Sequence, residues 1–281
     1  MLKQRVITAV VLLVILLPAL FYPSYVPFAA FMLVAVGAAG WEWARLNGCG
    51  PRMALCMGAA TVLACALGWA SGLPMREMPA LWILAGAVWV LGGALLLRVA
   101  VPGWPKLAQP LRLAGGLLML WVAWLAAVQA RIVGINFLLS VLVLVWVADI
   151  FAYFAGRTFG LKFTRRKLAS AISPGKSWEG VWGGVVGVAL LALAWIGADT
   201  AMHAQVPSLY SRLLAKGGWF LGIAVVFLAA MSVVGDLIES LVKRSAGAKD
   251  SSALLPGHGG VLDRIDALLP VLPLAMMLVS W

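Results

Sequence analysis

Long hydrophobic segments alternate with short polar breaks along the whole chain. Most of these segments approach the length of about 20 residues that an α-helix needs to cross the hydrocarbon core of a bilayer. The breaks contain charged residues, proline or glycine, which are typical of connections between helices. The pattern predicts nine transmembrane helices, at residues 6–22, 25–40, 53–70, 80–97, 113–130, 132–155, 181–198, 217–242 and 265–281.

The composition excludes an ordinary water-soluble fold. Hydrophobic residues make up 64% of the 281 residues and charged residues only 11%, whereas soluble proteins average about 45–50% apolar and about 25% charged residues. Lys3 and Arg5 precede the first apolar run in the layout of a signal peptide, but no small-x-small cleavage site follows it cleanly. We therefore predict an all-α integral membrane protein that retains its first helix.

The 21 Lys and Arg residues predict the orientation of the helices. If the nine helices alternate across the bilayer with the N-terminus inside, 17 basic residues fall on the inner face, and only Arg76, Arg131, Arg212 and Lys216 fall outside. Cytoplasmic loops of membrane proteins carry such an excess of basic residues. This predicts a cytoplasmic N-terminus and an outer C-terminal Trp281, and it accounts for the net charge of +11 without a nucleic-acid partner.

Acidic residues are concentrated in the second half of the chain. Seven of the ten lie between the sixth and ninth predicted helices, toward the inner face. The first five predicted helices are accompanied only by Glu42 and Glu77, which we place in loops. We therefore expect one continuous membrane domain with an N-terminal scaffold, residues 1–131, and a C-terminal catalytic region, residues 132–281.

The strongest candidate for chemistry is the charged stretch from residue 235 to residue 266. If the eighth helix continues through its first part, four polar side chains share one helix face at spacings i, i+3, i+4 and i+7: Asp236, Glu239, Ser240 and Lys243. Carboxylates at a membrane helix are costly unless they pair, face water or bind a metal. This face is therefore a candidate site at the cytoplasmic boundary.

A glycine-rich turn, the PGHGG of residues 256–260, follows this helix and lets the backbone approach a ligand closely. Asp263 and Asp266 then open the ninth predicted helix, where free N–H groups favour anions. Hard oxygen ligands such as Asp236 and Asp263 suit magnesium. Four basic side chains can neutralise phosphate charge: Lys243, Arg244, Lys249 and Arg264. A solvated loop is the alternative, but the combination of features favours a metal-bridged polyphosphate site.

Two further clusters leave alternatives open. The segment SPGKSWEG, residues 173–180, is not a P-loop, because the pattern requires a glycine where Ser170 stands. It is either a substrate loop with Lys176 near phosphate and Glu179 in the first helical turn, or a helix-initiating turn. Asp149, with Tyr153 and Arg157 one and two turns further on, is either a ligand or the partner of a neighbouring helix.

The stretch from Ser240 to Asp266 resembles the signature of the phosphatidate cytidylyltransferase family, also called CDP-diacylglycerol synthases. That signature has a Ser, a Lys-Arg pair, Lys-Asp, PGHGG and a hydrophobic-x-Asp-Arg-x-Asp ending. The chain supplies these positions in order and without a gap: Ser240, Lys243, Arg244, Lys249, Asp250, Pro256, His258, Gly259, Gly260, Asp263, Arg264 and Asp266. The resemblance extends to Asp149, Tyr153, Gly156, Arg157 and SPGKSWEG, where many members have Lys and Thr in place of Gly175 and Ser177.

The resemblance implies transfer of a cytidylyl group from CTP to phosphatidic acid, giving CDP-diacylglycerol and pyrophosphate at the inner face of a bacterial-type plasma membrane. It implies magnesium at Asp236 and Asp263, with a second ion that is magnesium or a monovalent cation. We expect these residues to carry the chemistry: Asp236, Lys243, Arg244, Lys249, Asp250, His258, Asp263, Arg264 and Asp266. We expect these to contact substrate: Asp149, Tyr153, Arg157, Ser173, Lys176, Ser177, Glu179, Ser240, Gly259 and Gly260. The sequence permits a homodimer without predicting one.

Other functions fit the sequence less well. A transporter or channel predicts polar residues throughout the mid-membrane segments, whereas here the charges gather at one face. A CDP-alcohol phosphotransferase would need a DGxxAR motif, which is missing. A relative that acts on an isoprenoid lipid phosphate stays open.

Overall fold

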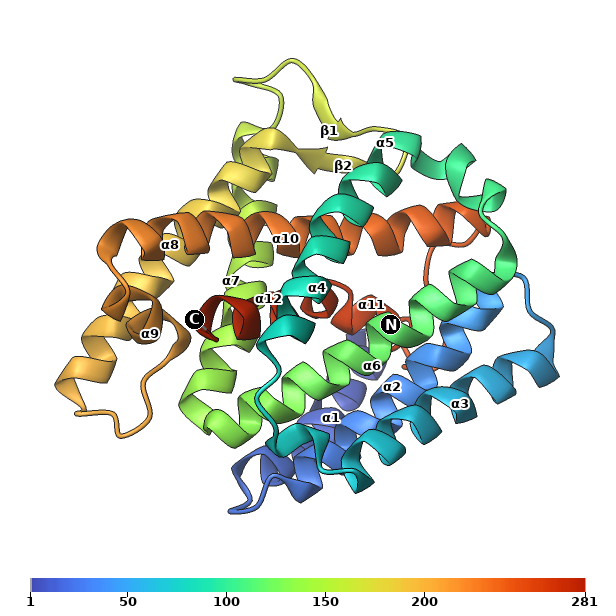
Figure 1. Ribbon diagram of the computed structural model, residues 1–281. Helices are drawn as coiled ribbons and strands as arrows, with labels where there is room; N and C mark the ends of the chain where they lie inside the picture. Colours follow the sequence, from blue (N-terminus) through green and yellow to red (C-terminus); the bar gives the residue numbers. More distant parts are fainter. Residues whose placement is uncertain (1, 281) are drawn as a thin grey trace.

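The computed structural model describes the backbone of residues 2–280 and the side chains of residues 4–280. The predicted outer position of Trp281 and the inner position of the Lys3 side chain lie outside the described residues. The fold is an assembly of long helices with one short β-hairpin (Figure 1).

Among the described residues, eight helical segments are long and apolar enough to span a membrane. Seven are single α-helices: α1 Leu2–Phe21, α2 Val26–Leu46, α3 Pro51–Ala70, α6 Gln109–Val133, α7 Ile135–Phe159, α8 Trp178–Ala201 and α10 Gly218–Ser245. The remaining one, Pro79–Lys106, joins α4 Pro79–Ala87, a π-helical turn Val88–Gly92, α5 Gly93–Gly103 and a 3₁₀ turn Trp104–Lys106. The first eight predicted helices are thus confirmed as elements, and the prediction of an all-α integral membrane protein holds.

The ninth predicted helix has a different character. It forms a four-residue helix, α11 Leu262–Ile265, and then α12 Leu268–Val279. Twelve residues of α-helix extend about 18 Å, which is short of the roughly 30 Å of hydrocarbon in a bilayer. Helix α12 is buried along most of its length and packs against α4, α6 and α10 at the centre of the bundle (dark red in Figure 1). The count of nine spans is therefore not confirmed.

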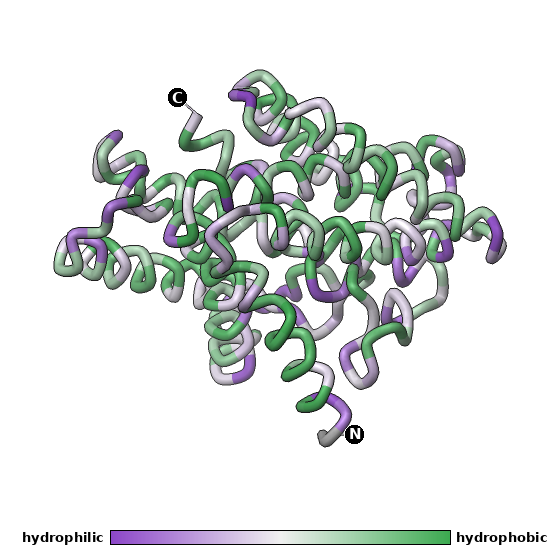
Figure 2. Tube along the Cα trace, turned by 90° about the horizontal axis from the view of Figure 1, so that it is seen from below, coloured by the Kyte–Doolittle hydropathy of each residue, from purple (hydrophilic) through white to green (hydrophobic). Residues whose placement is uncertain are grey.

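Polar residues lie where the helices end. Figure 2 shows hydrophobic residues along most of each helix and hydrophilic residues mainly in the connections and at helix ends. Two short helices or turns occupy such connections, η1 Leu73–Met75 and α9 Leu209–Ala215. This distribution is what a bundle with a hydrocarbon-facing exterior requires.

Small residues bring α7 and α8 into close contact. A Cβ atom added to Gly183 would lie 2.2 Å from the Cβ of Ala155, and one added to Gly187 would lie 2.4 Å from the ring of Phe151. Glycines at helix interfaces allow such close packing in membranes. The same contact fixes the start of α8 beside the end of α7, which is where the candidate site lies.

The connection between α7 and α8 forms a β-hairpin that the sequence did not predict. Strands β1 Lys167–Ala169 and β2 Ser173–Ser177 pair antiparallel, with Lys167 opposite Ser177 and Ala169 opposite Ser173. The hairpin lies at the top of Figure 1, and β2 leads directly into α8. It carries the SPGKS residues as an extended strand, so Lys176 projects from a strand next to a helix N-terminus.

Candidate active site

A cavity of about 370 Å³ lies between α7, the hairpin with the start of α8, and α10. Six of the predicted site residues line it: Asp149, Tyr153, Arg157, Lys176, Ser177 and Asp236. They come from positions up to 87 residues apart, which only the packing of α7, α8 and α10 brings together. The other lining residues are mostly small or apolar, among them Gly156, Gly175 and Gly180.

An ion pair ties the hairpin to α10 across this cavity. The Lys176 ammonium contacts Asp236 Oδ2, and the Ser240 hydroxyl donates to Asp236 Oδ1 at 3.2 Å. Both partners of the ion pair are about a quarter to a third exposed. The carboxylate of Asp236 therefore faces the cavity while a cation holds it in place.

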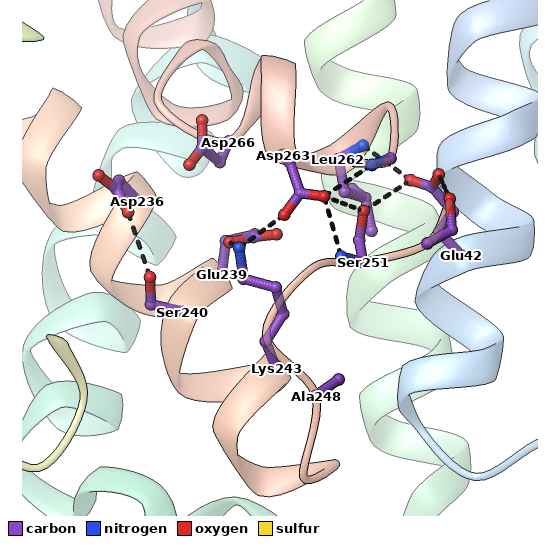
Figure 3. A network of polar contacts seen from close by, with 12 residues as sticks. Glu42, Asp236, Glu239, Ser240, Lys243, Ala248, Ser251, Leu262, Asp263 and Asp266 are labelled. Carbon is purple, nitrogen blue, oxygen red and sulfur yellow. Dashed lines mark hydrogen bonds and ion pairs between the residues drawn. The ribbon is translucent and has the colours of Figure 1, made fainter. Parts of the chain in front are cut away.

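A second cluster of charges surrounds Asp263, next to the end of α10 (Figure 3). The Lys243 ammonium lies 2.5 Å from Glu239 Oε2 and 2.6 Å from Asp263 Oδ1. The other carboxylate oxygen, Asp263 Oδ2, accepts from the N–H groups of Ser251 and Gly260, at 2.9 and 2.7 Å. The Ser251 hydroxyl also donates to Asp263 Oδ2, at 2.9 Å. We refer to Glu42, Glu239, Lys243, Ser251 and Asp263 as the Asp263 cluster.

The carboxyl groups of Asp263 and Asp266 have opposite electrostatic environments. Burial opposes ionisation of Asp263, but hydrogen bonds from Lys243, Gly260 and Ser251 outweigh it and lower the pKa of Asp263 to about 2. Burial raises the pKa of Asp266, and the nearby negative charge of Asp236 raises it further. Asp266 thus lies within electrostatic reach of Asp236, which lines the cavity.

The PGHGG turn packs tightly against Asp263 and Ser251. Gly259 has φ +82°, and a Cβ there would lie 2.6 Å from Asp263 Oδ2. A Cβ on Gly260 would lie 2.0 Å from the Ser251 hydroxyl. The turn is closed by hydrogen bonds between Leu255 and Gly259 and between His258 and Leu255, each 2.8 Å. The glycines therefore allow the backbone to approach these side chains closely.

Several predicted site residues serve local structure. Ser177 is the N-cap of α8 and accepts from the Gly180 N–H at 3.2 Å. Glu179 is buried and accepts from the N–H groups of Phe163 and Thr164, at 3.1 and 2.7 Å. Its carboxylate holds the turn after α7 and does not line the cavity.

The remaining predicted residues lie at the surface or at the edge of the site. Ser173 begins β2. The Arg244 guanidinium donates to the Ala248 carbonyl at 3.2 Å, and His258 is half-buried with an Nδ1 that has no hydrogen-bond partner among the described residues. Three charged side chains are exposed: Lys249, Asp250 and Arg264.

A model described as the cytidylyltransferase family matches residues 3–281 of the chain. The chain belongs to this family. It is 42% identical to a phosphatidate cytidylyltransferase of Pseudomonas aeruginosa, over 97% of this chain and 95% of that protein. It is 40% identical to a protein of the same name from Haemophilus influenzae, over 97% of this chain and 96% of that protein. A third, from Bacillus subtilis, is 37% identical over 52% of this chain and 48% of that protein.

Glu42 is a buried acid that was not among the predicted site residues. Glu42 lies inside α2 and not in a loop, and its carboxylate is fully buried against residues of the connection between α10 and α11. The expectation that it lies in a loop is therefore wrong. A single acid at the end of an otherwise apolar segment was the available signal, but its partners are more than 200 positions away.

Cytidylyl transfer implies a metal ion, for which carboxylates would be the protein ligands. Among residues 4–280, no three or more His, Cys, Asp or Glu side chains are arranged to hold a metal ion. Magnesium commonly takes only one or two carboxylates and completes its shell with water and substrate phosphate. Asp236 and Asp263 supply hard oxygen donors of this kind, each with a lysine as its present partner. The donor set fits magnesium if those ammonium groups shift to substrate phosphates.

Proposed function

We propose that the protein transfers the CMP moiety of CTP to phosphatidic acid and forms CDP-diacylglycerol and pyrophosphate. The observation that carries this proposal is the meeting of Lys176 and Asp236 in a cavity of an apolar helix bundle. The similarity of nearly the whole chain to proteins named phosphatidate cytidylyltransferase supports the choice of substrates. We expect the product in phospholipid biosynthesis and no nucleic-acid partner.

The reaction needs a site that brings two anions together. A bond forms between a phosphatidate oxygen and the α-phosphorus of CTP, the bond from that phosphorus to the bridging oxygen breaks, and pyrophosphate leaves with the electron pair. Catalysis of such a transfer rests on positioning and on neutralising charge. No side chain needs to become covalently bound to the nucleotide.

The protein's own residues divide this work. The ammonium groups of Lys176 and Lys243 are held beside carboxylates, so both can turn to a phosphate without a large movement of the backbone. Arg157 and Arg264 are exposed near the same cavity and can bind the outer phosphates. Magnesium bound at Asp236 and Asp263 would supply further charge neutralisation at the phosphates.

The lipid substrate can reach the cavity from the bilayer. Tyr153 lines the cavity, and its neighbour Phe154 and the nearby Trp178 are exposed apolar side chains at the ends of α7 and α8. Acyl chains can therefore stay among these side chains while the phosphate enters. We place the cavity at the cytoplasmic face of the inner membrane, where CTP is available, in accord with the excess of basic residues on that side.

The division of the chain into a scaffold region and a catalytic region is part of this proposal, as is the oligomeric state. Residues 132–281 would supply every group that contacts substrate, and residues 1–131 would support them. The sequence permits a homodimer, and sedimentation of the purified protein would determine the oligomeric state.

The proposal is tested by incubating purified protein with CTP, phosphatidate and magnesium, and by identifying the lipid product by mass spectrometry. We expect CDP-diacylglycerol with the wild type and a severe loss of product with Asp263→Asn. A parallel reaction with a polyprenyl phosphate tests the isoprenoid alternative. Absence of CDP-diacylglycerol with the wild type, or full activity of Asp263→Asn, would refute the assignment.

A further inference from the structure

Glu42 is a buried carboxylate in the half of the protein that otherwise has a scaffold character. It lies near the end of α2, has 0% of its surface exposed, and is flanked by Trp41 and Trp43. A buried carboxylate is strongly unfavourable unless hydrogen-bond donors surround it. The donors that surround Glu42 therefore show what holds it there.

All of these donors come from one distant segment, residues 251–262, which comprises most of the connection between α10 and α11 and the first residue of α11. At the start of this segment the Ser252 hydroxyl donates to Glu42 Oε1 at 2.6 Å. At its end the N–H groups of Val261 and Leu262 donate to Oε1 and Oε2 at 2.9 and 2.8 Å. One carboxylate thus clamps both ends of the connection, and it satisfies N–H groups that the short helix α11 leaves free.

The same segment carries the groups that hold Asp263. The Ser251 hydroxyl lies between the two carboxylates, 2.9 Å from Asp263 Oδ2 and 3.2 Å from Glu42 Oε2, and its single proton can be donated to either (Figure 3). The N–H of Gly260 donates to Asp263, and a Cβ on Gly260 would lie 2.3 Å from Glu42 Oε1. A displacement of Glu42 would therefore shift two of the donors that fix the Asp263 carboxylate.

A second contact from the N-terminal half reaches the middle of the segment. The Thr8 hydroxyl of α1 donates to the carbonyl of Pro256 at 2.9 Å. This bond is exposed, and it complements the buried clamp at the two ends of the segment. The N-terminal helices therefore hold the PGHGG turn from outside the region expected to contain the site.

We infer that Glu42 is a positioning residue, which fixes residues 251–262 and thereby sets the orientation of Asp263 without touching substrate. The inference rests on the proposed function, because it assigns Glu42 to the site at which Asp263 acts. It also corrects the view of residues 1–131 as a scaffold alone. The variant Glu42→Gln keeps the size of the side chain but removes one acceptor oxygen and the charge, so it can no longer accept from all four donors of the segment.

Two readouts on the purified full-length protein test this role. The first is hydrogen–deuterium exchange of the peptide that contains residues 251–262, which needs no substrate. The second is the dependence of CDP-lipid formation on Mg²⁺ concentration, together with kcat and KM for CTP. Glu77→Gln is the matched control, because it removes the same charge from an exposed residue of the N-terminal half.

In Glu42→Gln we expect faster exchange within residues 251–262, while peptides of α6 and α7 keep their protection. Loss of a supporting group at a metal site typically lowers metal affinity or activity by about 10- to 100-fold. We therefore expect a lower kcat and a higher Mg²⁺ concentration for half-maximal rate, with KM for CTP changing much less. A role in stability alone would reduce the fraction of active protein and leave the Mg²⁺ dependence unchanged.

Wild-type exchange and wild-type Mg²⁺ dependence in Glu42→Gln would overturn the inference. If Glu42→Gln folds poorly, Ser252→Ala removes one of the clamping donors and should cause smaller changes in the same direction. If it causes none, the inference also fails. Should the wild type form no CDP-lipid, the proposed function fails, but the exchange experiment still decides whether Glu42 fixes the segment.

Discussion

The Lys243 ammonium is the only cation that contacts two carboxylates among the ion pairs of the described residues. Its side chain is 12% exposed, and those of Glu239 and Asp263 are 4% and 5% exposed. Solvent and salt screen such buried charges far less than surface pairs. The stability of this part of the fold should therefore depend strongly on the charge of Lys243.

The variant Lys243→Met keeps a long unbranched side chain but removes the ammonium group. Glu239 and Asp263 then face each other without a shared cation. Removing one partner of a buried ion pair destabilises proteins by about 3–5 kcal/mol, a large share of the roughly 5–15 kcal/mol by which proteins are stable. Adding Glu239→Gln removes one of the two uncompensated charges, so the double variant should be more stable than Lys243→Met alone.

Thermal unfolding in detergent, followed by the fluorescence of the 14 tryptophans, measures this effect. We expect a clear fall in the midpoint for Lys243→Met and partial recovery in the double variant. Lys249→Met is the control for stability, because Lys249 is exposed and makes no ion pair among the described residues. If Lys243→Met unfolds at the wild-type temperature, or if Glu239→Gln brings no recovery, the assigned charge balance is wrong.

Two other predictions concern packing and topology. Gly260→Ala should lower the free energy of unfolding by about 1–3 kcal/mol through overpacking against Ser251 and Glu42, and it should lower the rate of CDP-lipid formation. The control Gly222→Ala, with nothing within 4 Å of the added Cβ, should retain wild-type behaviour in both assays. Equal behaviour of the two variants would contradict the close packing. In a background without the three native cysteines, Ser170→Cys should react with an impermeant maleimide only from the cytoplasmic side and Gln205→Cys only from the opposite side. Reaction of both from one side would contradict the topology.

Hydropathy alone predicted the eight long helices, because each must satisfy its backbone hydrogen bonds internally and present apolar side chains to lipid. It could not separate α12 from a membrane span. A segment that is apolar all round is compatible with lipid contact and with burial inside the bundle, and only the packing of α12 against α4, α6 and α10 decides between them.

The candidate site was predicted in part for a similar reason. The spacing of Asp236, Ser240 and Lys243 on one helix face follows from helical periodicity, and their neighbours in the structure agree with it. The partnership of Lys176 with Asp236 depends on how α8 meets α10. Contacts between segments so far apart carry no local signal in a single sequence.

Glu42 and Glu179 show most clearly which roles of acidic residues a single sequence could not predict. Both are acids next to tryptophan at the edge of an apolar segment, and one was assigned to a loop and the other to substrate. In the structure each accepts hydrogen bonds from backbone N–H groups of another segment. Residue type and spacing indicated a charged site, whereas the division between groups that contact substrate and groups that hold loops required the fold.

In the proposed reaction, the α-phosphoryl group of CTP is transferred with its nucleoside to phosphatidate. This transfer is tested most directly by giving the purified protein phosphatidate and magnesium with CTP that carries ³²P in either the α or the γ position. We predict that the α-label enters the lipid product and that the γ-label leaves entirely as pyrophosphate. Entry of the γ-label into lipid, or no lipid labelling from α-labelled CTP, would contradict the account.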